Sequence, residues 1–213
     1  MIKKLLLLFM CLFLVGCKPL QKMDIDEVIE NGTKRTLKVY NKYRRGYKYN
    51  LPKGLEVSDN KFYNEIIHSN QYTYYLYVDA VSFYNKVIEK YEINKDAYIS
   101  KQINYQDKYG YLEVNEQKNG KYFIEIMYNY AKIEVIVNKN DINVVVSNAL
   151  SILTSIKFND NVLKNLLYEE TSLFKEYQFD IFETTKEVES SYLQAVEEDE
   201  EKKDEIHDID LID

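Results

Sequence analysis

The fold of this chain is decided by residues 121–157, which read KYFIEIMYNYAKIEVIVNKNDINVVVSNALSILTSIK. Apolar side chains alternate with a period of two in residues 121–128 and 132–138, which is typical of β-strands. In residues 141–157 they recur at intervals of three and four, as on one face of an amphipathic helix. Strands joined by so short a turn must be antiparallel, so this stretch predicts an antiparallel sheet with a helix packed on it.

The same patterns extend in both directions from this stretch. Further strands are predicted at 36–43, 46–51, 62–68, 72–79 and 111–114, with turns at 107–110 and 118–120. Residues 83–90 are compatible with a short helix, residues 161–176 predict a C-terminal helix, and residues 177–182 a late edge strand. We therefore predict one α+β domain over residues 35–183, in which an antiparallel β-sheet is packed by the helix at about 141–157 and by the C-terminal helix.

The N-terminus reads MIKKLLLLFMCLFLVGC, in which two lysines precede an unbroken apolar run from Leu5 to Val15. This run has the length of a signal sequence and is shorter than the roughly 20 residues that span a bilayer. Its end, Leu14-Val15-Gly16-Cys17, resembles the lipobox of bacterial lipoproteins. The resemblance implies that residues 1–16 are a signal peptide and that Cys17 carries a diacylglyceryl group. An ordinary secretory signal with an incidental cysteine is the alternative.

The segments on either side of the predicted domain are polar. Residues 17–34 are expected to be a lipid-anchored tether with at most one helical turn. Residues 184–213 are expected to be a disordered acidic tail, because residues 197–213 hold ten acidic and two basic side chains. These residues carry a net charge of −8, whereas the formal net charge of the whole chain is −7. The acidity of the chain therefore belongs to this tail.

The order of the elements also resembles the PsbP-like fold. The matching residues are the strand and turn Tyr47-Lys48-Tyr49-Asn50-Leu51-Pro52-Lys53-Gly54 and the end of the helix, Leu153-Thr154-Ser155-Ile156-Lys157-Phe158. This resemblance covers about 110 residues and implies an α/β/α sandwich. Members of that group act mostly as assembly or binding factors without a shared catalytic site.

Composition and motifs argue against several chemistries. The net charge disfavours a nucleic-acid partner, and two histidines 139 positions apart disfavour a zinc site. The glycines are scattered, so no phosphate-binding loop or dinucleotide fingerprint is present, and we predict no cofactor, no metal site and no catalytic residues. His68 lies near Asp79 and Ser82 in sequence, but without a nucleophile elbow it is expected to be a surface residue at a strand end.

Tyrosine is the unusual feature of the sequence, because 18 of the 21 tyrosines lie between Tyr40 and Tyr130. The strand at 72–79 carries aromatic side chains on both faces. One face must pack on the core. We expect a second layer of helix to cover the other face, since tyrosine is a common strand residue. The alternative is that Tyr75 and Tyr77 on this face form an exposed platform for a glycan or a peptide.

These observations predict a protein on the outer face of the cell membrane, anchored through Cys17. Because no catalytic constellation is apparent, we expect a non-catalytic binding or assembly module of the cell envelope, with an envelope protein or a glycan as its partner. A carboxylate-based cell-wall hydrolase and an accessory lipoprotein of a small-ligand receptor are the alternatives.

Overall fold

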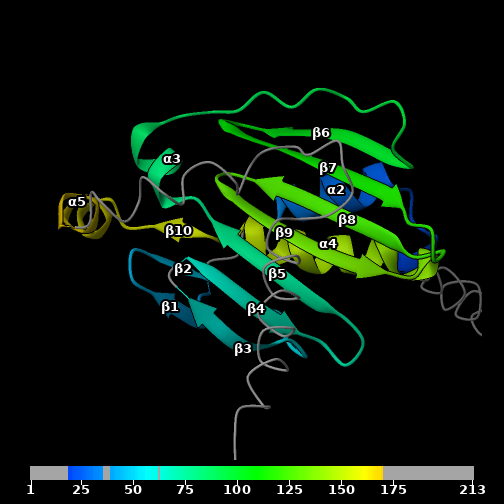
Figure 1. The fold of residues 1–213 in the computed structure, drawn as a ribbon, viewed down its shortest axis with the longest axis horizontal. Coiled ribbons are helices and arrows are strands. Elements are labelled where there is room, and N and C mark those ends of the chain that lie inside the picture. Colours follow the sequence, from blue (N-terminus) through cyan, green and yellow to red (C-terminus); the bar gives the residue numbers. More distant parts are fainter. Residues whose placement is uncertain (1–18, 36–38, 62, 170–213) are drawn as a thin grey trace, which may run out of the picture.

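The computed structural model describes residues 19–35, 39–61 and 63–169. The helical elements are η1 (Leu20–Lys22), α2 (Ile25–Lys34), α3 (Ala80–Asn85), η2 (Lys139–Asp141), α4 (Ile142–Leu153) and α5 (Asp160–Glu169). The strands are β1 (Lys42–Arg44), β2 (Tyr47–Tyr49), β3 (Glu56–Lys61), β4 (Asn64–His68), β5 (Thr73–Val78), β6 (Ile99–Tyr105), β7 (Lys108–Glu116), β8 (Tyr122–Tyr128), β9 (Ala131–Val137) and β10 (Lys157–Phe158). The predicted α+β class is confirmed (Figure 1).

A seven-stranded antiparallel sheet forms the body of the protein, in the order β3-β4-β5-β9-β8-β7-β6. Strands β6 to β9 follow one another through short turns, as the alternating pattern predicts for β8, β9 and the middle of β7. The turn predicted at 107–110 is misplaced, because the turn lies at residues 106–107 and β7 already begins at Lys108. The strand β5 pairs with β9, and this pairing joins the early strands β3 to β5 to the late strands β6 to β9 in one open sheet. Strands β3 and β6, which lie at the two edges, were not predicted, because their polar residues do not alternate with apolar ones.

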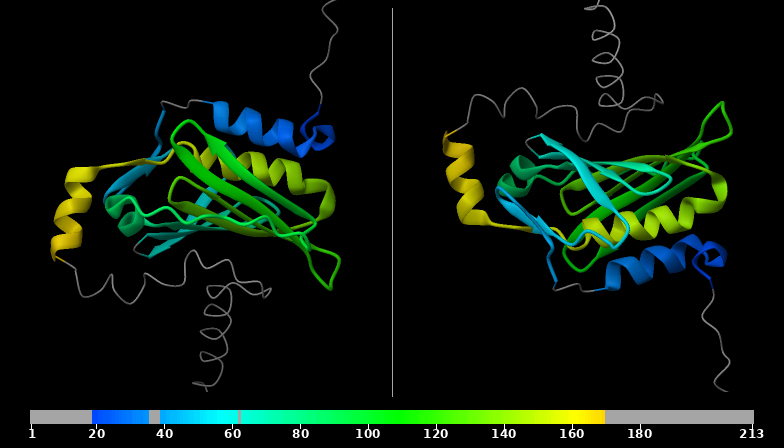
Figure 2. Two further views of the ribbon diagram at one scale, coloured as in Figure 1. Left: turned by 90° about the horizontal axis from the view of Figure 1, so that it is seen from above. Right: turned by 90° about the horizontal axis from the view of Figure 1, so that it is seen from below.

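The helix α4 covers one face of this sheet, as predicted. Its apolar stripe is fully buried with the inward side chains of β8 and β9. The helix α2 lies beside α4 on the same face (Figure 2). Since α2 and α4 share one face and α5 contacts α3, the second helical layer of an α/β/α sandwich is not found among the described residues, and the PsbP-like resemblance stays a prediction.

The segment expected to be a tether is partly a docked helix, so that expectation is wrong for α2. Asp24 caps this helix, accepting a hydrogen bond from the backbone of Asp26, while the Glu27 side chain accepts one from the backbone of Asp24. Val28 is buried in the main core, and Gly32 lies so close to Leu150 of α4 that a Cβ atom would not fit. The local capping signal and the apolar stripe together favour a packed helix over a flexible segment.

A small three-stranded sheet, β1-β2-β10, flanks the large one. It is joined to the large sheet by the buried carboxylate of Glu65 on β4. The hydroxyls of Tyr47 and Tyr49 each donate to this carboxylate at 2.7 Å, and the Nη2 of Arg44 lies 2.6 Å from it. Three donors thus satisfy one buried charge, as burial of a charge requires.

The C-terminal predictions are tested only in part. The helix predicted at 161–176 is present as α5, which the structure describes up to Glu169. The strand predicted at 177–182, the acidic tail at 184–213, the signal peptide at 1–16 and Cys17 lie outside the described residues. Within the described part of the chain, no helix is both long and apolar enough to cross a membrane.

Candidate functional site

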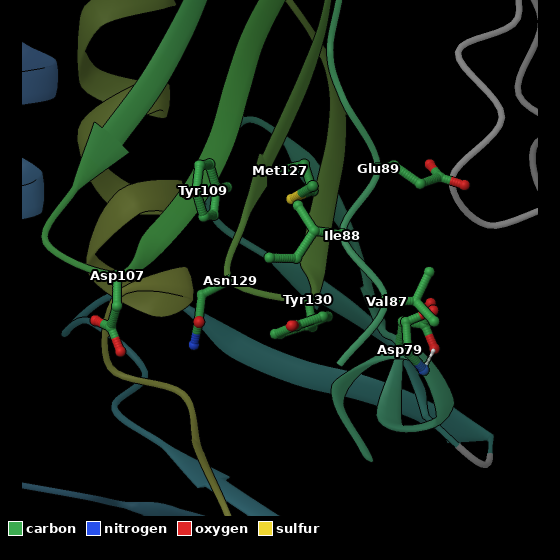
Figure 3. Close-up of a pocket in the computed structure, with 10 residues that line it drawn as sticks. Asp79, Val87, Ile88, Glu89, Asp107, Tyr109, Met127, Asn129 and Tyr130 are labelled. Atoms are coloured by element: carbon green, nitrogen blue, oxygen red, sulfur yellow. Dashed lines mark hydrogen bonds between the residues drawn. The ribbon is translucent and has the colours of Figure 1, made fainter. Parts of the chain in front are cut away.

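A small hollow lies at one end of the large sheet, beside α3 (Figure 3). Its cavity volume is about 40 Å³. Four segments form it: the start of α3, the connection from α3 to β6, the β6–β7 turn and the β8–β9 turn. The lining residues are Asp79, Ser82, Val87, Ile88, Glu89, Asp107, Tyr109, Met127, Asn129 and Tyr130.

The β8–β9 turn gives the hollow its floor and has an unusual backbone. Asn129 and Tyr130 both have positive φ values, 52° and 67°. Two such residues form the tight turn whose twist matches an antiparallel hairpin, but a tyrosine there is uncommon. The turn is held from both sides, since the Asn129 N–H donates to the Tyr109 carbonyl at 2.9 Å and the Asp79 N–H donates to the Tyr130 carbonyl at 2.8 Å. The strained turn is therefore fixed rather than loose.

Asp79 is the best-placed acid of the hollow. It ends β5 and begins α3, where its carboxylate accepts a hydrogen bond of 2.8 Å from the Ser82 N–H. Burial raises the pKa of Asp79, although the bonds to the start of α3 oppose this effect. Burial and the nearby Asp79 charge raise the pKa of Tyr130. The site therefore combines a partly desolvated carboxylate with a neutral phenol.

The rim of the hollow is apolar and exposed. Val87 and Ile88 are each 49% exposed, and Tyr109 is 45% exposed. Such exposed apolar side chains around a hollow are typical of binding surfaces. The charged residues in the lining are all acidic, with no lysine or arginine among them. The lining thus favours a guest that is apolar along its length and positively charged.

The acids of the hollow do not converge on one point. In Figure 3, Asp107 and Asp79 lie on opposite sides of the Asn129–Tyr130 turn, and Glu89 points away from the other lining side chains. Paired carboxylates for hydrolysis would face each other across a substrate. The arrangement in the hollow favours binding over hydrolysis.

A second concentration of charge crosses the outer face of the large sheet, which is the face opposite α4. Glu113, Glu125 and Glu134 lie directly opposite one another on β7, β8 and β9. Like charges in register destabilise a sheet, so such a row needs compensation. Lys132 supplies part of it, because its Nζ lies 3.2 Å from Glu125 and 2.7 Å from Glu134.

Each glutamate of this row also accepts a hydrogen bond from a tyrosine hydroxyl. Tyr111 donates to Glu125 at 2.6 Å, Tyr77 donates to Glu134 at 3.2 Å, and Tyr91 donates to Glu113 at 2.5 Å. The ring of Tyr91, on the connection between α3 and β6, stacks on the ring of Tyr111 with centroids 4.3 Å apart. This connection therefore lies across the outer face, and the row is an internal polar network rather than an open site.

The network shifts the ionisation of its members. Burial raises the pKa of Glu125, and the charge of Lys132 opposes this shift. Burial lowers the pKa of Lys132, but the two carboxylates outweigh it and hold that pKa above its ordinary value. Burial, reinforced by Glu125, raises the pKa of the Tyr111 hydroxyl far above its ordinary value.

The tyrosine platform considered on β5 does not include Tyr77. This residue is 4% exposed, which agrees with a covered face and contradicts the exposed alternative. Its hydroxyl serves Glu134, and the Lys132 Nζ lies 5.2 Å from the centre of its ring. Tyr75 is half-buried and lines a shallow groove with Tyr72 and Lys121. The sequence alternation showed the two faces of β5 but not the polar network that covers one of them.

The remaining candidates from the sequence are separated. His68 is exposed at the end of β4, as predicted, and its Nδ1 lies 2.9 Å from the Thr73 hydroxyl. Asp79 and Ser82 lie at the opposite end of β5, so these three residues form no catalytic group. In residues 19–35, 39–61 and 63–169, no three His, Cys, Asp or Glu side chains are placed to hold a metal ion.

The hollow itself was not predicted from the sequence. The alternating strands at 121–128 and 132–138 indicate the tight turn between them, but not the other segments that meet at this turn. A comparison with known proteins adds no relationship: no family model, no curated protein and no solved structure matches this chain.

Proposed function

We propose that this chain is a lipid-anchored, non-catalytic binding module on the outer face of the cytoplasmic membrane, and that the hollow beside α3 receives a basic segment of an envelope protein. The lipobox-like end of the apolar N-terminal run, Leu14 to Cys17, supports the anchor. The observation that carries the binding role is the lining of the hollow, in which exposed apolar side chains surround acidic groups and no basic one.

Basic protein segments fit this lining better than glycans do. A lysine or arginine side chain has an apolar stem, which can pack on Val87 and Ile88, and a charged head, which can reach Asp79. A neutral glycan would leave the partly desolvated Asp79 carboxylate without a counter-charge.

The binding role is tested by photocrosslinking in the host. A photoreactive residue at Ile88 should capture one dominant envelope protein, and the same residue at Tyr43, which is exposed on β1, should not. The variant Asp79→Asn keeps a side chain able to cap α3 but removes the charge, so it should reduce the Ile88 adduct about tenfold. Asp59→Asn, an exposed change on β3, is the matched control.

Two results would contradict the binding role. Equal adducts from Ile88 and Tyr43 would show capture without a site. An adduct at Ile88 that is unchanged by Asp79→Asn would show that charge recognition is wrong. Recovery of glycan in place of protein would shift the partner class, and turnover of a wall polymer lost in Asp79→Asn would favour the hydrolase.

The anchor is tested separately. The wild-type chain should partition with membranes, and mass spectrometry of its N-terminal peptide should show a diacylglyceryl group on Cys17. Cys17→Ala should abolish this modification and leave the precursor unprocessed. A processed chain that lacks any lipid mass would contradict the anchor and favour an ordinary secretory signal.

A further inference from the structure

The first described element of the chain is firmly attached to the body. The Nδ2 of Asn143, in the first turn of α4, donates to the Leu20 carbonyl at 3.2 Å and to the Met23 carbonyl at 2.8 Å. The side chains of Leu20 and Met23 pack on the main core. The ordered body therefore begins at η1 rather than after a long flexible segment.

Covalent geometry then restricts where the body can lie relative to an anchor at Cys17. Three residue steps separate Cys17 from Leu20, and a fully extended chain covers about 11 Å over three steps. This length exceeds the headgroup region on one side of a bilayer, which is about 5 to 8 Å thick, by only a few ångströms. If the acyl chains on Cys17 are in the bilayer, the end of the body that bears η1 is therefore held at the headgroups or within a few ångströms of them.

We infer that the end of the molecule formed by η1, η2 and the β7–β8 turn is a membrane-contact surface for anionic phospholipid headgroups. We call it the anchor end. The inference rests on the proposed lipidation of Cys17 and adds an orientation to it. Figures 1 and 2 show these three elements at one end of the long axis, with α3 and α5 at the other.

The register of the sheet supports this grouping. Glu116, the last residue of β7, is opposite Tyr122, and Tyr122 is in turn opposite Val137, the last residue of β9. The β7–β8 turn and η2 therefore lie next to each other. The helix α4, whose first turn holds η1, follows η2 directly.

Aromatic and basic side chains meet at the anchor end. The rings of Tyr98 and Tyr122 are 4.8 Å apart, and the Nζ of Lys139 lies 5.0 Å and 5.8 Å from their respective centres. Tyrosine and lysine are the residues that place an apolar body at the headgroup level and a polar tip in water. Tyr98 is among the exposed large side chains of the described surface.

The anchor end carries both basic and acidic side chains, and its lysines are exposed to an approaching headgroup. Exposed lysines lie on each of the three elements: Lys22 on η1, Lys118 and Lys121 in the β7–β8 turn, and Lys139 on η2. The nearby acids include Asp24, Asp96, Glu116 and Asp141. Two of them are engaged inside the protein, because Asp24 caps α2 and Asp141 accepts a 2.6 Å hydrogen bond from Tyr72.

The hollow beside α3 lies at the opposite end. The strand β8 runs from Tyr122 at the anchor end to Tyr128 beside the β8–β9 turn, a distance of about 20 Å. In this orientation the hollow faces away from the bilayer, where a partner from the envelope can reach it.

Two labelled variants of the lipidated full-length chain test the orientation. Asn140→Cys places a thiol on η2, and Asn85→Cys places one at the end of α3; both asparagines are exposed. In the proposed mature protein, Cys11 has been removed with the signal peptide and the sulfur of Cys17 carries the lipid. Each variant therefore has one free thiol. A fluorophore on this thiol is read in vesicles of phosphatidylglycerol that contain a headgroup spin label.

The expected result is quenching at least threefold stronger at position 140 than at position 85. Lys118→Glu combined with Lys121→Glu should weaken the quenching at position 140, while Lys86→Glu combined with Lys90→Glu, on the α3 side, should not. Equal quenching at both positions, or stronger quenching at position 85, would overturn the orientation. Quenching at position 140 that ignores both charge pairs would overturn the role of anionic headgroups.

Failure of the anchor is distinguishable from failure of the orientation. Each sample is first checked for diacylglyceryl mass on its N-terminal peptide and for flotation with the vesicles. A chain without lipid that does not float overturns the proposed anchor and the orientation together. A lipidated chain that floats but shows the wrong quenching order overturns the orientation alone.

Discussion

Arg44 and Glu65 form an ion pair between the two sheets, with 2.6 Å between Nη2 and Oε2 and with the Glu65 side chain wholly buried. The pair is the polar centre of an otherwise apolar contact, and the hydroxyls of Tyr47 and Tyr49 complete it. Glu65→Ala would leave one half-buried cation and two buried hydroxyls without their acceptor. We expect this change to lower the free energy of unfolding by about 3 to 5 kcal/mol.

Urea denaturation followed by circular dichroism measures this loss. Glu56→Ala, on the exposed surface of β3, is the control and should change the free energy of unfolding by less than about 0.5 kcal/mol. Equal effects of the two substitutions would show that Glu65 is not the polar link between the sheets.

The contact between α2 and α4 is tested by two adjacent substitutions to alanine. Alanine stabilises an isolated helix by about 1 kcal/mol relative to glycine. At Gly32, however, the added Cβ would lie 2.7 Å from Cδ1 and 2.9 Å from Cβ of Leu150. Gly32→Ala should therefore destabilise the protein by about 1 to 3 kcal/mol, whereas Asn31→Ala, on the exposed face of α2, should be neutral or slightly stabilising.

The two variants are compared by their melting temperatures and by the hydrogen-exchange rates of the α2 amides. The amides should exchange faster in Gly32→Ala than in Asn31→Ala, because the helix would be pushed from its place on α4. If Gly32→Ala raised the melting temperature, α2 would behave as a free helix, as the expectation of a tether requires.

Alkaline pH should weaken the fold through the buried hydroxyls. Burial raises the pKa of Tyr128 to about 12, and burial together with Glu65 raises that of Tyr47 well above its ordinary value. The unfolded chain therefore loses these protons first as the pH rises above about 10, so the folded state binds more protons and stability falls. The stabilisation is complete below the unfolded value and is lost as the pH rises through the folded one.

Urea midpoints measured between about pH 8 and pH 11 test this dependence. Tyr111→Phe removes one raised pKa and should make the alkaline decline shallower, although it also removes the bond to Glu125 and lowers stability at neutral pH. Tyr43→Phe, at an exposed position, should leave the slope unchanged. A wild-type midpoint that stays constant over this range would contradict the assignment.

Lys132 should be essential to the glutamate row. Lys132→Met removes the cation that contacts Glu125 and Glu134, so the two carboxylates would face each other in a buried place. We expect a loss of about 3 to 5 kcal/mol at neutral pH. Lys61→Met, at an exposed position on β3, is the control.

The stability that Lys132→Met loses at neutral pH should be partly restored in acid. Burial raises the pKa of Glu125 in the native protein, and the loss of Lys132 removes the charge that opposes this shift. The folded state of Lys132→Met then takes up protons before the unfolded chain does, so its stability is highest below the unfolded value near 4.5 and falls as the pH rises. Denaturation midpoints at about pH 4 and pH 7 measure this, and equal losses at both would contradict it.

The elements that sequence alone predicted are those with a local signal. The apolar stripe of α4 and the alternation of β8 and β9 are each contained in one short stretch, and the structure has both. The hydrogen bond that Tyr77 makes was beyond such reasoning, because its acceptor, Glu134, is 57 positions away. The hollow was missed for the same reason, since segments from α3 to β9 form it.

The error on α2 had a different origin. Its composition is polar, with a single fully buried residue, Val28, so an average over the segment resembles a linker. The capping box of Asp24 and Glu27 was the specific local signal, and it was outweighed by composition. A helix of this kind is stabilised by the partner that it contacts, which composition does not describe.

The pairing of β2 with β10 affects when the protein can finish folding during its synthesis. Tyr47 is matched with Phe158 in this sheet, about 110 positions later in the chain. A chain made from its N-terminus can pair β2 with β1 at once, but the other edge of β2 stays open until almost the whole domain has been synthesised, and α2 similarly lacks its contact with α4. Contacts of such long range slow folding and leave strand edges exposed in the meantime. Completion of the small sheet is thus a late event, which requires residue 158.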